Sequence, residues 1–506
     1  MSLKLNLLLA LLLVTGGALL LSSFFSLPLE LTLLGVAGLG LSLYLAVRAP
    51  ELFLVASIFA PQWKTFWIFK SLGQFGDLTI AMLLCLAAGL AWRVMLWFGR
   101  LRYGQIRDLF SQQLGPILAY LVFAALVTAS YFYTSAPNYG GSKLLRFLLI
   151  GTLFLMAPSF ILFTEDNFLR FARLFMGFSA MTAIQLVTNL ETRSADAEND
   201  ITRIGAGWLM GMAILILLFY PLTRNRKWQR ALVIFLLPLF LAGLMASAAR
   251  GPMVAVGIAV LIGVAILLRE GTLRVATALI LLFILVTGIG GAYFVLRQTD
   301  LGKYTAKAGE LEVLFTQGSS SGSAGKRVDF YRATLAALPN QPLIGTGIGS
   351  WSTFYFGNDQ RNYPHNLFLE IAFEQGLVGL AAFLALLALV GVATYRMIRA
   401  SRSHFLVLGL LILYCAIISM FSGDLDDNRL LWMWVGVTLA VCRLVQVRVQ
   451  AFRSMQKAAA RRAPAAPARP YGAPAFPRHL ASARRLDSER YSLQKKDRAW
   501  REKFVF

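Results

Sequence analysis

The chain of 506 residues is 58% hydrophobic and 14% charged, with a formal net charge of +23 and a mean hydropathy of +0.65. This composition leaves too little polar surface for a soluble globular fold, and the apolar runs repeatedly reach the roughly 20 residues that cross a bilayer as a helix. The composition therefore excludes a soluble enzyme and predicts an all-α polytopic membrane protein.

Apolar runs predict 14 membrane spans along the chain, at 5–24, 29–47, 51–69, 78–98, 115–133, 144–163, 168–189, 205–222, 230–247, 252–268, 273–295, 367–395, 404–421 and 429–446. The first run follows a lysine but lacks a convincing small-residue cleavage pattern, so we interpret it as a helix rather than a signal peptide. The patterns at 51–69 and 168–189 are the weakest, so we expect about 12 to 14 helices in total.

Lys and Arg gather in the loops on one side of these spans, and this bias predicts that the side is cytoplasmic. The basic segments are 93–107, 224–230, 269–274, 396–402 and the tail, whereas 134–143, 190–204, 248–251, 296–366 and 422–428 fall on the opposite, external side. We therefore expect four parts: N-terminal helices (1–295), an external loop with short helices (296–366), C-terminal helices (367–446) and a basic, disordered cytoplasmic tail (447–506).

The positive charge is unevenly placed along the chain. Residues 447–506 hold 15 Lys and Arg against 4 Asp and Glu, a net charge of +11. From Arg461 to Arg478, arginine alternates with Ala and Pro, as in disordered segments. This placement favours a tail that lies against anionic lipid headgroups over a nucleic-acid partner.

The three cysteines, Cys85, Cys415 and Cys442, lie within or at the ends of apolar runs and have no paired spacing. They suggest neither a disulfide framework nor a cysteine metal site. We interpret them as packing residues.

The most informative stretch is Pro364-His365-Asn366, followed after nine residues by Gly376 and then by Gly379. His365 is one of only three histidines, and an imidazole at a membrane surface can take a proton from an attacking hydroxyl. A chemical site is one interpretation. The other is a helix start, with His365 or Asn366 as the cap and two glycines that let a neighbouring helix come close.

The external loop has two parts. Residues 298–325 end in a flexible Gly- and Ser-rich stretch, and an amphipathic helix is predicted from Lys326 to Pro339. A glycine-rich turn, Pro342 to Gly349, follows. Its backbone N–H groups could bind phosphate, but no lysine follows, so a simple tight turn is the other interpretation.

Arg250 lies at an external break between two spans, followed by Gly251 and Pro252. It either extends to the lipid headgroups or is held by a fixed turn. Together the external basic residues could line a pocket for an anionic headgroup, because arginine suits bidentate phosphate contact. The others are Lys143, Arg146, Arg193, Arg203, Arg327, Arg332 and Arg361.

Three aspartates, Asp424, Asp426 and Asp427, precede Arg429 at the start of the last span. Acidic residues complement the N-terminus of a helix, so capping is one interpretation. The alternatives are a carboxylate that orients His365 or a divalent metal site.

The order of these features resembles that of the O-antigen ligase and polymerase superfamily of bacterial envelope glycosyltransferases. The features are the Arg-Gly turn, the loop arginines, the glycine-rich turn and the His-Asn motif with its Gly-x-x-Gly. The resemblance covers residues 247–379, and the His-Asn spacing is similar to that of the ligases in particular. It implies a GT-C type fold in the bacterial inner membrane with a periplasmic active site. It also implies transfer of a glycan from undecaprenyl diphosphate to the outer-core sugar of lipid A-core, in lipopolysaccharide biosynthesis.

Carried over by position, the resemblance implies that His365 is the essential histidine and Arg250 the arginine after the small-residue run. Either Arg327 or Arg332 would be the loop arginine, and Asp427 the carboxylate, with Asp424 and Asp426 as rivals. We expect His365 to deprotonate the acceptor hydroxyl and Asp427 to orient it. The diphosphate would bind to cations, without metal or cofactor, chosen from Arg250, Arg327, Arg332, Arg203, Arg146 and Lys143.

Three alternatives use related features. An O-antigen polymerase has the same donor, with another undecaprenyl-linked glycan as acceptor. A protein O-oligosaccharyltransferase resembles the same family but has an additional external C-terminal domain. A transporter of lipid-linked sugars would need charged residues deep in the membrane, and spans such as 230–247 and 252–268 have none.

Overall fold

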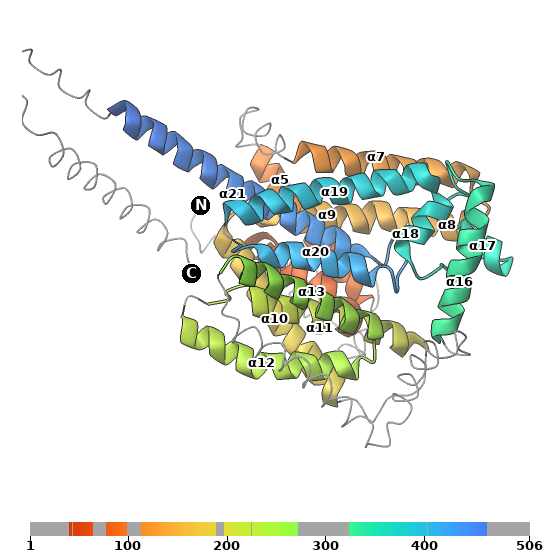
Figure 1. Cartoon of the computed structure of the whole chain (residues 1–506), viewed down its shortest axis with the longest axis horizontal. Helices are drawn as coiled ribbons and strands as arrows, with labels where there is room; N and C mark the ends of the chain where they lie inside the picture. The colour runs from red at the N-terminus through yellow and green to blue at the C-terminus, as the bar shows by residue number, and fades with distance from the viewer. Residues whose placement is uncertain are drawn as a thin grey trace, which may run out of the picture.

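The computed structural model describes residues 40–42, 44–63, 77–98, 113–188, 197–223, 225–271, 323–401 and 403–462. These residues form helices and connecting turns, with no strand among them (Figure 1). Eight of the described helices are long and apolar enough to cross a membrane, or nine if the bent pair Gly40–Arg48 and Pro50–Trp63 is one span. The predicted all-α class is confirmed, and the described helices are consistent with a polytopic membrane protein.

Most predicted spans that fall on described residues correspond to helices. The prediction for 78–98 coincides with α5 (Leu78–Phe98), and 115–133 corresponds to α7 (Leu114–Ser130) with the 3-10 turn Tyr131–Tyr133. The others are α10 (Glu165–Thr188), α11 (Ala197–Phe219), α12 (Arg226–Ala246), α13 (Arg250–Arg269) and α20 (Leu406–Ile418). The expected spans at 5–24 and 273–295 lie outside the described residues, so about 12 to 14 helices stays a prediction.

The expected spans at 29–47 and 51–69 differ from the structure. The helix that ends at Arg48 meets α3 (Pro50–Trp63) at an angle of 115°. Pro50 has no N–H to donate and restricts the residue before it, so the helix cannot continue straight. Only eight of the described helices are single spans by length and apolarity.

The expected span at 144–163 begins earlier than predicted. α8 (Pro137–Arg146), a π-helical turn (Phe147–Gly151) and α9 (Thr152–Ile161) form one candidate span. Pro137 starts this helix, which suits a residue that has no N–H to leave unpaired. Lys143 therefore lies on a helix and not in the external loop 134–143.

The expected single span at 367–395 is wrong, because the structure has two helices there. α18 (Leu367–Glu374) ends at Gln375, and α19 (Gly376–Ala400) follows at once. Gly376 has a positive φ of 67°, and a Cβ on it would lie 2.2 Å from the carbonyl oxygen of Leu343. Only glycine allows this approach, so the glycine-rich turn packs into the break between the two helices.

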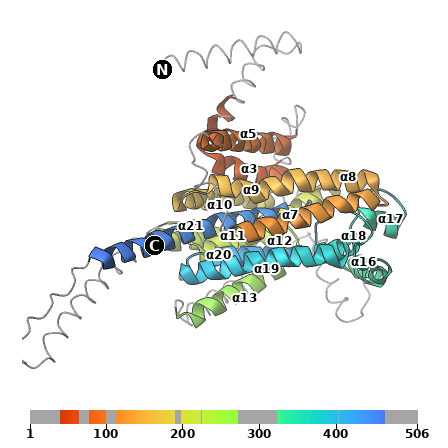
Figure 2. The ribbon, with the colours of Figure 1, turned by 90° about the horizontal axis from the view of Figure 1, so that it is seen from above.

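The core of the bundle is centred on α21 (Arg429–Arg462), whose Trp432 and Trp434 are fully buried. Figure 2 shows α21 passing between α9 and α20. The helix continues beyond residue 446, where the last span was expected to end, so the first part of the tail is helical and not irregular. Residues 463–506 lie outside the described part. The three cysteines are buried and free, in agreement with their predicted packing role.

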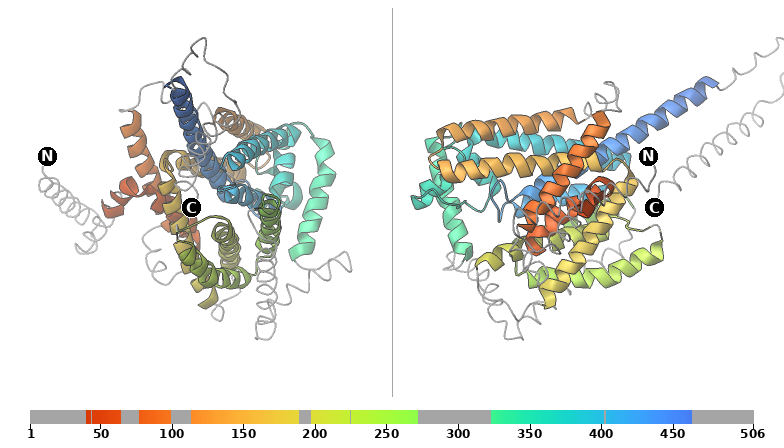
Figure 3. Two further views of the ribbon diagram at one scale, coloured as in Figure 1. Left: turned by 60° about the vertical axis from the view of Figure 1, so that its left-hand side comes forward. Right: turned by 180° about the vertical axis from the view of Figure 1, so that it is seen from behind.

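One end of the bundle carries the features that the sequence marked as chemical. α16 (Ser323–Ala337) runs across the ends of the long helices, with α17 (Ser350–Phe356) and α18 beside it (Figure 1). The view from behind in Figure 3 puts these short helices at the end opposite to the last turns of α21. Two short helices therefore lie within the expected external loop.

Candidate active site

His365 and Asn366 divide the two roles that the sequence left open. The Asn366 side chain accepts hydrogen bonds from the backbone N–H groups of Phe368 (3.0 Å) and Leu369 (3.2 Å), and so caps α18. His365 has a positive φ of 58°, a backbone conformation that residues other than glycine rarely adopt. Asn366 thus caps α18, and the imidazole of His365 takes no part in the cap.

The imidazole of His365 is held between aromatic rings. Its centroid lies 4.5 Å from the ring of Tyr363 and 6.1 Å from that of Phe330, which it faces at 11°. Its Nδ1 is buried without a hydrogen-bond partner in the described part of the chain. Burial and then the charge of Arg327 lower the pKa of His365 to about 4, although Asp424 opposes them. At neutral pH the ring is therefore uncharged and able to accept a proton.

α16 presents Arg327 and Tyr331 to this histidine. The Tyr331 hydroxyl lies 3.2 Å from the carbonyl oxygen of His365 and 2.8 Å from that of Met420. Residues four apart share a face of a helix, and the charge of Arg327 acts on both Tyr331 and His365. Arg332 is exposed and lies about 140° around the helix from Arg327. The structure thus brings Arg327, and not Arg332, beside His365.

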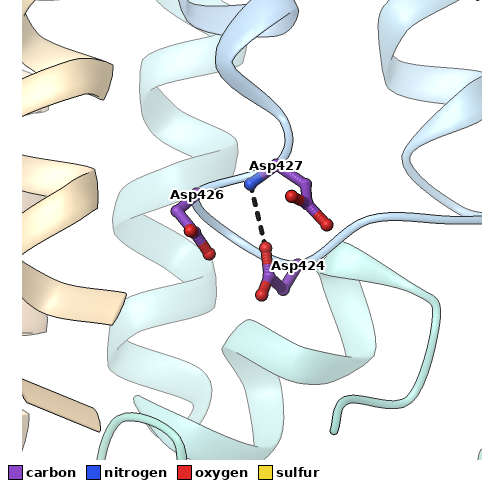
Figure 4. A group of neighbouring side chains, drawn as sticks. All are labelled: Asp424, Asp426 and Asp427. Carbon is purple, nitrogen blue, oxygen red and sulfur yellow. Dashed lines mark hydrogen bonds between the residues drawn. The ribbon is translucent and has the colours of Figure 1, made fainter. Parts of the chain in front are cut away.

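The three aspartates before α21 lie together, with one carboxylate oxygen of each within 4.8 Å of the others (Figure 4). Asp424 is fully buried and accepts hydrogen bonds from the Tyr139 hydroxyl (2.7 Å) and the Asp427 backbone N–H (2.9 Å). Burial alone would raise the pKa of Asp424, but a hydrogen bond with Asp426 and the charge of Arg361 hold it below its usual value. Burial and the negative Asp424 raise the pKa of Asp426. Asp426 therefore binds a proton more readily than Asp424 does.

Two arginines neutralise this cluster. Arg361 Nη2 lies 2.6 Å from Asp427 Oδ1, and its Nε lies 3.6 Å from Asp424 Oδ2. Arg146 Nε lies 2.9 Å from Asp426 Oδ2. Each carboxylate already has a cationic partner, which favours an ion-pair network over the metal site. The Asp424 carboxylate also accepts the N–H of Asp427, two residues before α21 begins.

Asp427 reaches His365 through another side chain. The Tyr363 hydroxyl donates a hydrogen bond of 3.4 Å to Asp427 Oδ2, and the Tyr363 ring contacts the imidazole. No hydrogen bond joins Asp427 and His365 within the described residues. The described contact between Asp427 and His365 thus runs through Tyr363, and orientation of His365 by Asp427 stays a prediction.

Lys143 is enclosed by two glutamates that the sequence analysis did not select. The lysine has no exposed surface, and its Nζ forms ion pairs with Glu370 and with Glu374 (2.6 Å). Both glutamates lie on α18, four residues apart on an otherwise apolar helix, and this rare pattern was the available signal. Lys143 therefore holds α8 to α18, and its predicted role in diphosphate binding does not fit.

The glycine-rich turn uses its own N–H groups for packing. The N–H of Thr346 donates to the Phe373 carbonyl (3.0 Å), and that of Gly347 to the Glu374 carbonyl (2.9 Å). These donors fix the turn to the end of α18. The tight-turn interpretation is therefore favoured over phosphate binding.

Arg250 begins α13 directly after a fixed turn. The Ser247 hydroxyl donates to the Leu244 carbonyl (2.6 Å) and accepts from the Ala249 N–H (3.3 Å), while Ala248 has a positive φ of 52°. The neighbouring Gly251 lies against Phe421, where an added Cβ would be 3.2 Å from the Phe421 Cβ. Arg250 is thus placed beside the segment that leads to the aspartates.

Arg203 lies on α11, one turn before Gly207, which packs against Ser247 and Ala249. It is therefore at the same end of the bundle as Arg250. Arg193, which the sequence grouped with the external basic residues, lies outside the described part of the chain.

Residues 235–384 match the family model described as O-Antigen ligase. Over residues 235–384, which we call the O-antigen ligase segment, the chain is similar to this family. The O-antigen ligase segment includes Arg250, Arg327, the glycine-rich turn and His365, and it ends before the three aspartates. No curated protein matches the chain.

Proposed function

We propose that this chain is a multi-pass inner-membrane O-antigen ligase of GT-C type. It would transfer a glycan from undecaprenyl diphosphate to the outer-core sugar of lipid A-core on the periplasmic face. The O-antigen ligase segment supports a glycosyltransferase of the ligase or polymerase type. The observation that carries the proposal is a neutral imidazole, His365, beside the cation Arg327 at the end of a membrane helix bundle.

The proposed reaction needs a base and a stabilised leaving group, because a glycosyl diphosphate is already activated. His365 takes the proton of the acceptor hydroxyl as its oxygen attacks the anomeric carbon. The bond from that carbon to the diphosphate oxygen breaks, and the diphosphate leaves with the electron pair. One direct displacement inverts the anomeric configuration.

We assign the charge on the departing diphosphate to Arg327 and Arg250, with Arg203 as a further cation at this end of the bundle. Arg332 points away from His365, and Arg146 is paired with Asp426. These two and Lys143 are therefore left out of the proposed diphosphate site. Fixed guanidinium groups supply the charge that a metal ion provides elsewhere, so the transfer is metal-independent.

We assign Asp427 and Arg361 a positioning role. Their ion pair fixes Asp427, which binds the hydroxyl of Tyr363, and the Tyr363 ring packs against the imidazole. Asp427 thus acts on the base through Tyr363.

The test is transfer by purified protein from lipid-linked glycan to lipid A-core, with and without EDTA. We expect a product on lipid A-core with inverted anomeric configuration, measured by NMR, at the same rate in EDTA. A product in which one lipid-linked glycan extends another would instead establish the polymerase. Transport of the donor without any glycosidic product would contradict both enzymes.

A further inference from the structure

A second concave feature lies at the same end of the bundle, away from the aspartates. It is a cavity of about 220 Å³ between α17, the glycine-rich turn, the end of α16 and the end of α18. Ser135, in the turn before α8, completes its lining. None of the reaction residues assigned above lines it.

Most of the lining residues are polar and none is charged, although much of the surface they expose is apolar. Hydroxyl groups come from Ser135, Thr346, Ser350 and Thr353, and amide groups from Asn340 and Gln341. A site without a cation does not suit a diphosphate, whereas hydroxyl and amide groups both donate and accept hydrogen bonds. The lining therefore suits a neutral ligand with many hydroxyl groups.

The Thr346 and Ser350 hydroxyls already bond each other (2.6 Å), but other polar groups of the lining are available. Thr353 Oγ1 is buried and has no hydrogen-bond partner in the described part of the chain. A buried hydroxyl without a partner is costly, and a ligand hydroxyl would satisfy it. The Asn340 and Gln341 side chains are exposed, so their amides are free to turn toward a ligand.

The cavity also has an aromatic wall. Phe354 is 46% exposed, and its ring centroid lies 5.0 Å from that of Phe373. A pyranose ring has hydroxyl groups around its edge and C–H groups on its faces, so it needs both polar partners and an apolar surface. This cavity offers both.

We propose that this cavity binds one neutral pyranose unit of a glycan substrate. Its volume is below the roughly 300–1,000 Å³ of sites for drug-sized ligands, which fits one ring and not a longer chain. His365 precedes the start of α18 and Phe373 lies near its end, and the helix from Leu367 to Phe373 rises about 9 Å, so the cavity and the imidazole lie at opposite ends of α18. That separation exceeds one sugar ring, so the bound unit is remote from the bond being formed.

This inference rests on the proposed function, which supplies two glycans with such units. One is the polymer on the lipid-linked donor, and the other is the core oligosaccharide of the acceptor. Both present neutral hydroxylated rings, and the experiment distinguishes them.

Three variants remove one contribution each: Gln341→Ala an exposed amide, Thr353→Val the buried hydroxyl, and Phe354→Ala the aromatic face. Gln360→Ala is the matched control, because Gln360 is an exposed amide outside the cavity. KM and kcat are measured with long and single-repeat donors, and with complete and truncated core acceptors. Loss of one hydrogen bond is expected to raise KM roughly 2- to 12-fold for the glycan that fills the cavity. kcat should stay near wild type, because the reacting atoms are remote.

A higher KM for the long donor only assigns the cavity to the donor polymer, and a higher KM for the complete core only assigns it to the acceptor. Unchanged KM values for every substrate in well-folded Gln341→Ala and Phe354→Ala would overturn the proposal. The test with Gln341→Ala and Phe354→Ala remains valid even if Thr353→Val does not fold.

Saturation-transfer NMR separates this inference from the proposed function. The probes are oligosaccharides released by mild acid from the donor and from lipid A-core. Binding by wild type that is weakened in Gln341→Ala but not in Gln360→Ala supports the cavity even if no transfer occurs. Equal binding by wild type and all three cavity variants overturns it even if transfer is normal.

Discussion

The guanidinium of Arg361 holds the carboxylate of Asp427, with Nη2 and Oδ1 2.6 Å apart across 66 residues of sequence. Arg361 lies inside the O-antigen ligase segment, and Asp427 lies beyond its end. The same carboxylate binds Tyr363, whose ring touches His365. The surroundings of His365 are therefore complete only when the loop before α21 is docked against the O-antigen ligase segment.

Replacement of His365 by Gln should abolish transfer and leave the protein folded. General base catalysis contributes about 10²- to 10⁴-fold, so at least that loss is expected in the rate with lipid A-core as acceptor. The matched control is Asn366→Ala, which removes the helix cap and should cost about 0.5–2 kcal/mol of stability. Thermal unfolding and transfer rates together check both variants. Near-normal transfer by His365→Gln would remove the histidine from the mechanism.

The pH dependence of kcat/KM should reveal the pKa of His365. The neutral form is the base, so activity should fall only as the pH approaches about 4, the lowered pKa of this histidine. Arg327 contributes to that lowering, so Arg327→Gln should raise the pKa and move the acid limb of the profile to higher pH. Arg332→Gln, on another face of α16, should leave the limb unchanged. An acid limb that stays in place in Arg327→Gln would show that the two groups do not interact.

Arg250 should be required for leaving-group stabilisation. Arg250→Ala is expected to cost about 100- to 1,000-fold in rate, as the loss of one fixed charge partner does in such sites. Arg250→Lys should recover only part of it, because an ammonium group lacks the planar fork of a guanidinium. The rates are compared in EDTA and in Mg²⁺. Activity lost in EDTA and restored by Mg²⁺ would transfer the role to a metal bound by the aspartates.

Lys143 should matter for folding and not for donor binding. Lys143→Met leaves Glu370 and Glu374 buried without their cation, and breaking a buried pair in this way costs about 3–5 kcal/mol. Arg146→Met is the matched control: its side chain is 35% exposed, so water can replace part of its pairing with Asp426 and the loss of stability should be smaller than for Lys143→Met. Thermal unfolding in detergent and the KM for the donor measure the two effects. A stable Lys143→Met with a raised donor KM would restore the lysine to the diphosphate site.

The sequence predicted those helices that consist of one uninterrupted apolar run. The bounds predicted for α5 agree with the structure at both ends. The sequence did not predict that α8 begins at Pro137, because the polar Lys143 interrupts the apolar pattern. Lys143 is tolerated there because Glu374, which lies 231 residues away, binds it. Such a partner is invisible to any local pattern.

In the candidate site, too, local patterns were predictable from the sequence, and contacts between distant residues were not. His365 was found because its neighbours form a recognisable motif. The sequence alone did not distinguish Arg327 from Arg332, since that choice depends on how α16 is rotated against the loop. Arg361 was grouped with the other external arginines, and its importance follows only from its contact with Asp427.

At position 365 the positive φ favours glycine, whereas the proposed reaction requires histidine. A non-glycine residue in this conformation costs of the order of 1–3 kcal/mol, and glycine would adopt it without strain. A screen of random variants for thermal stability alone should therefore enrich glycine at position 365. The selected proteins should be more stable but inactive in glycan transfer. Thermostabilisation of this protein for structural work should hold position 365 fixed.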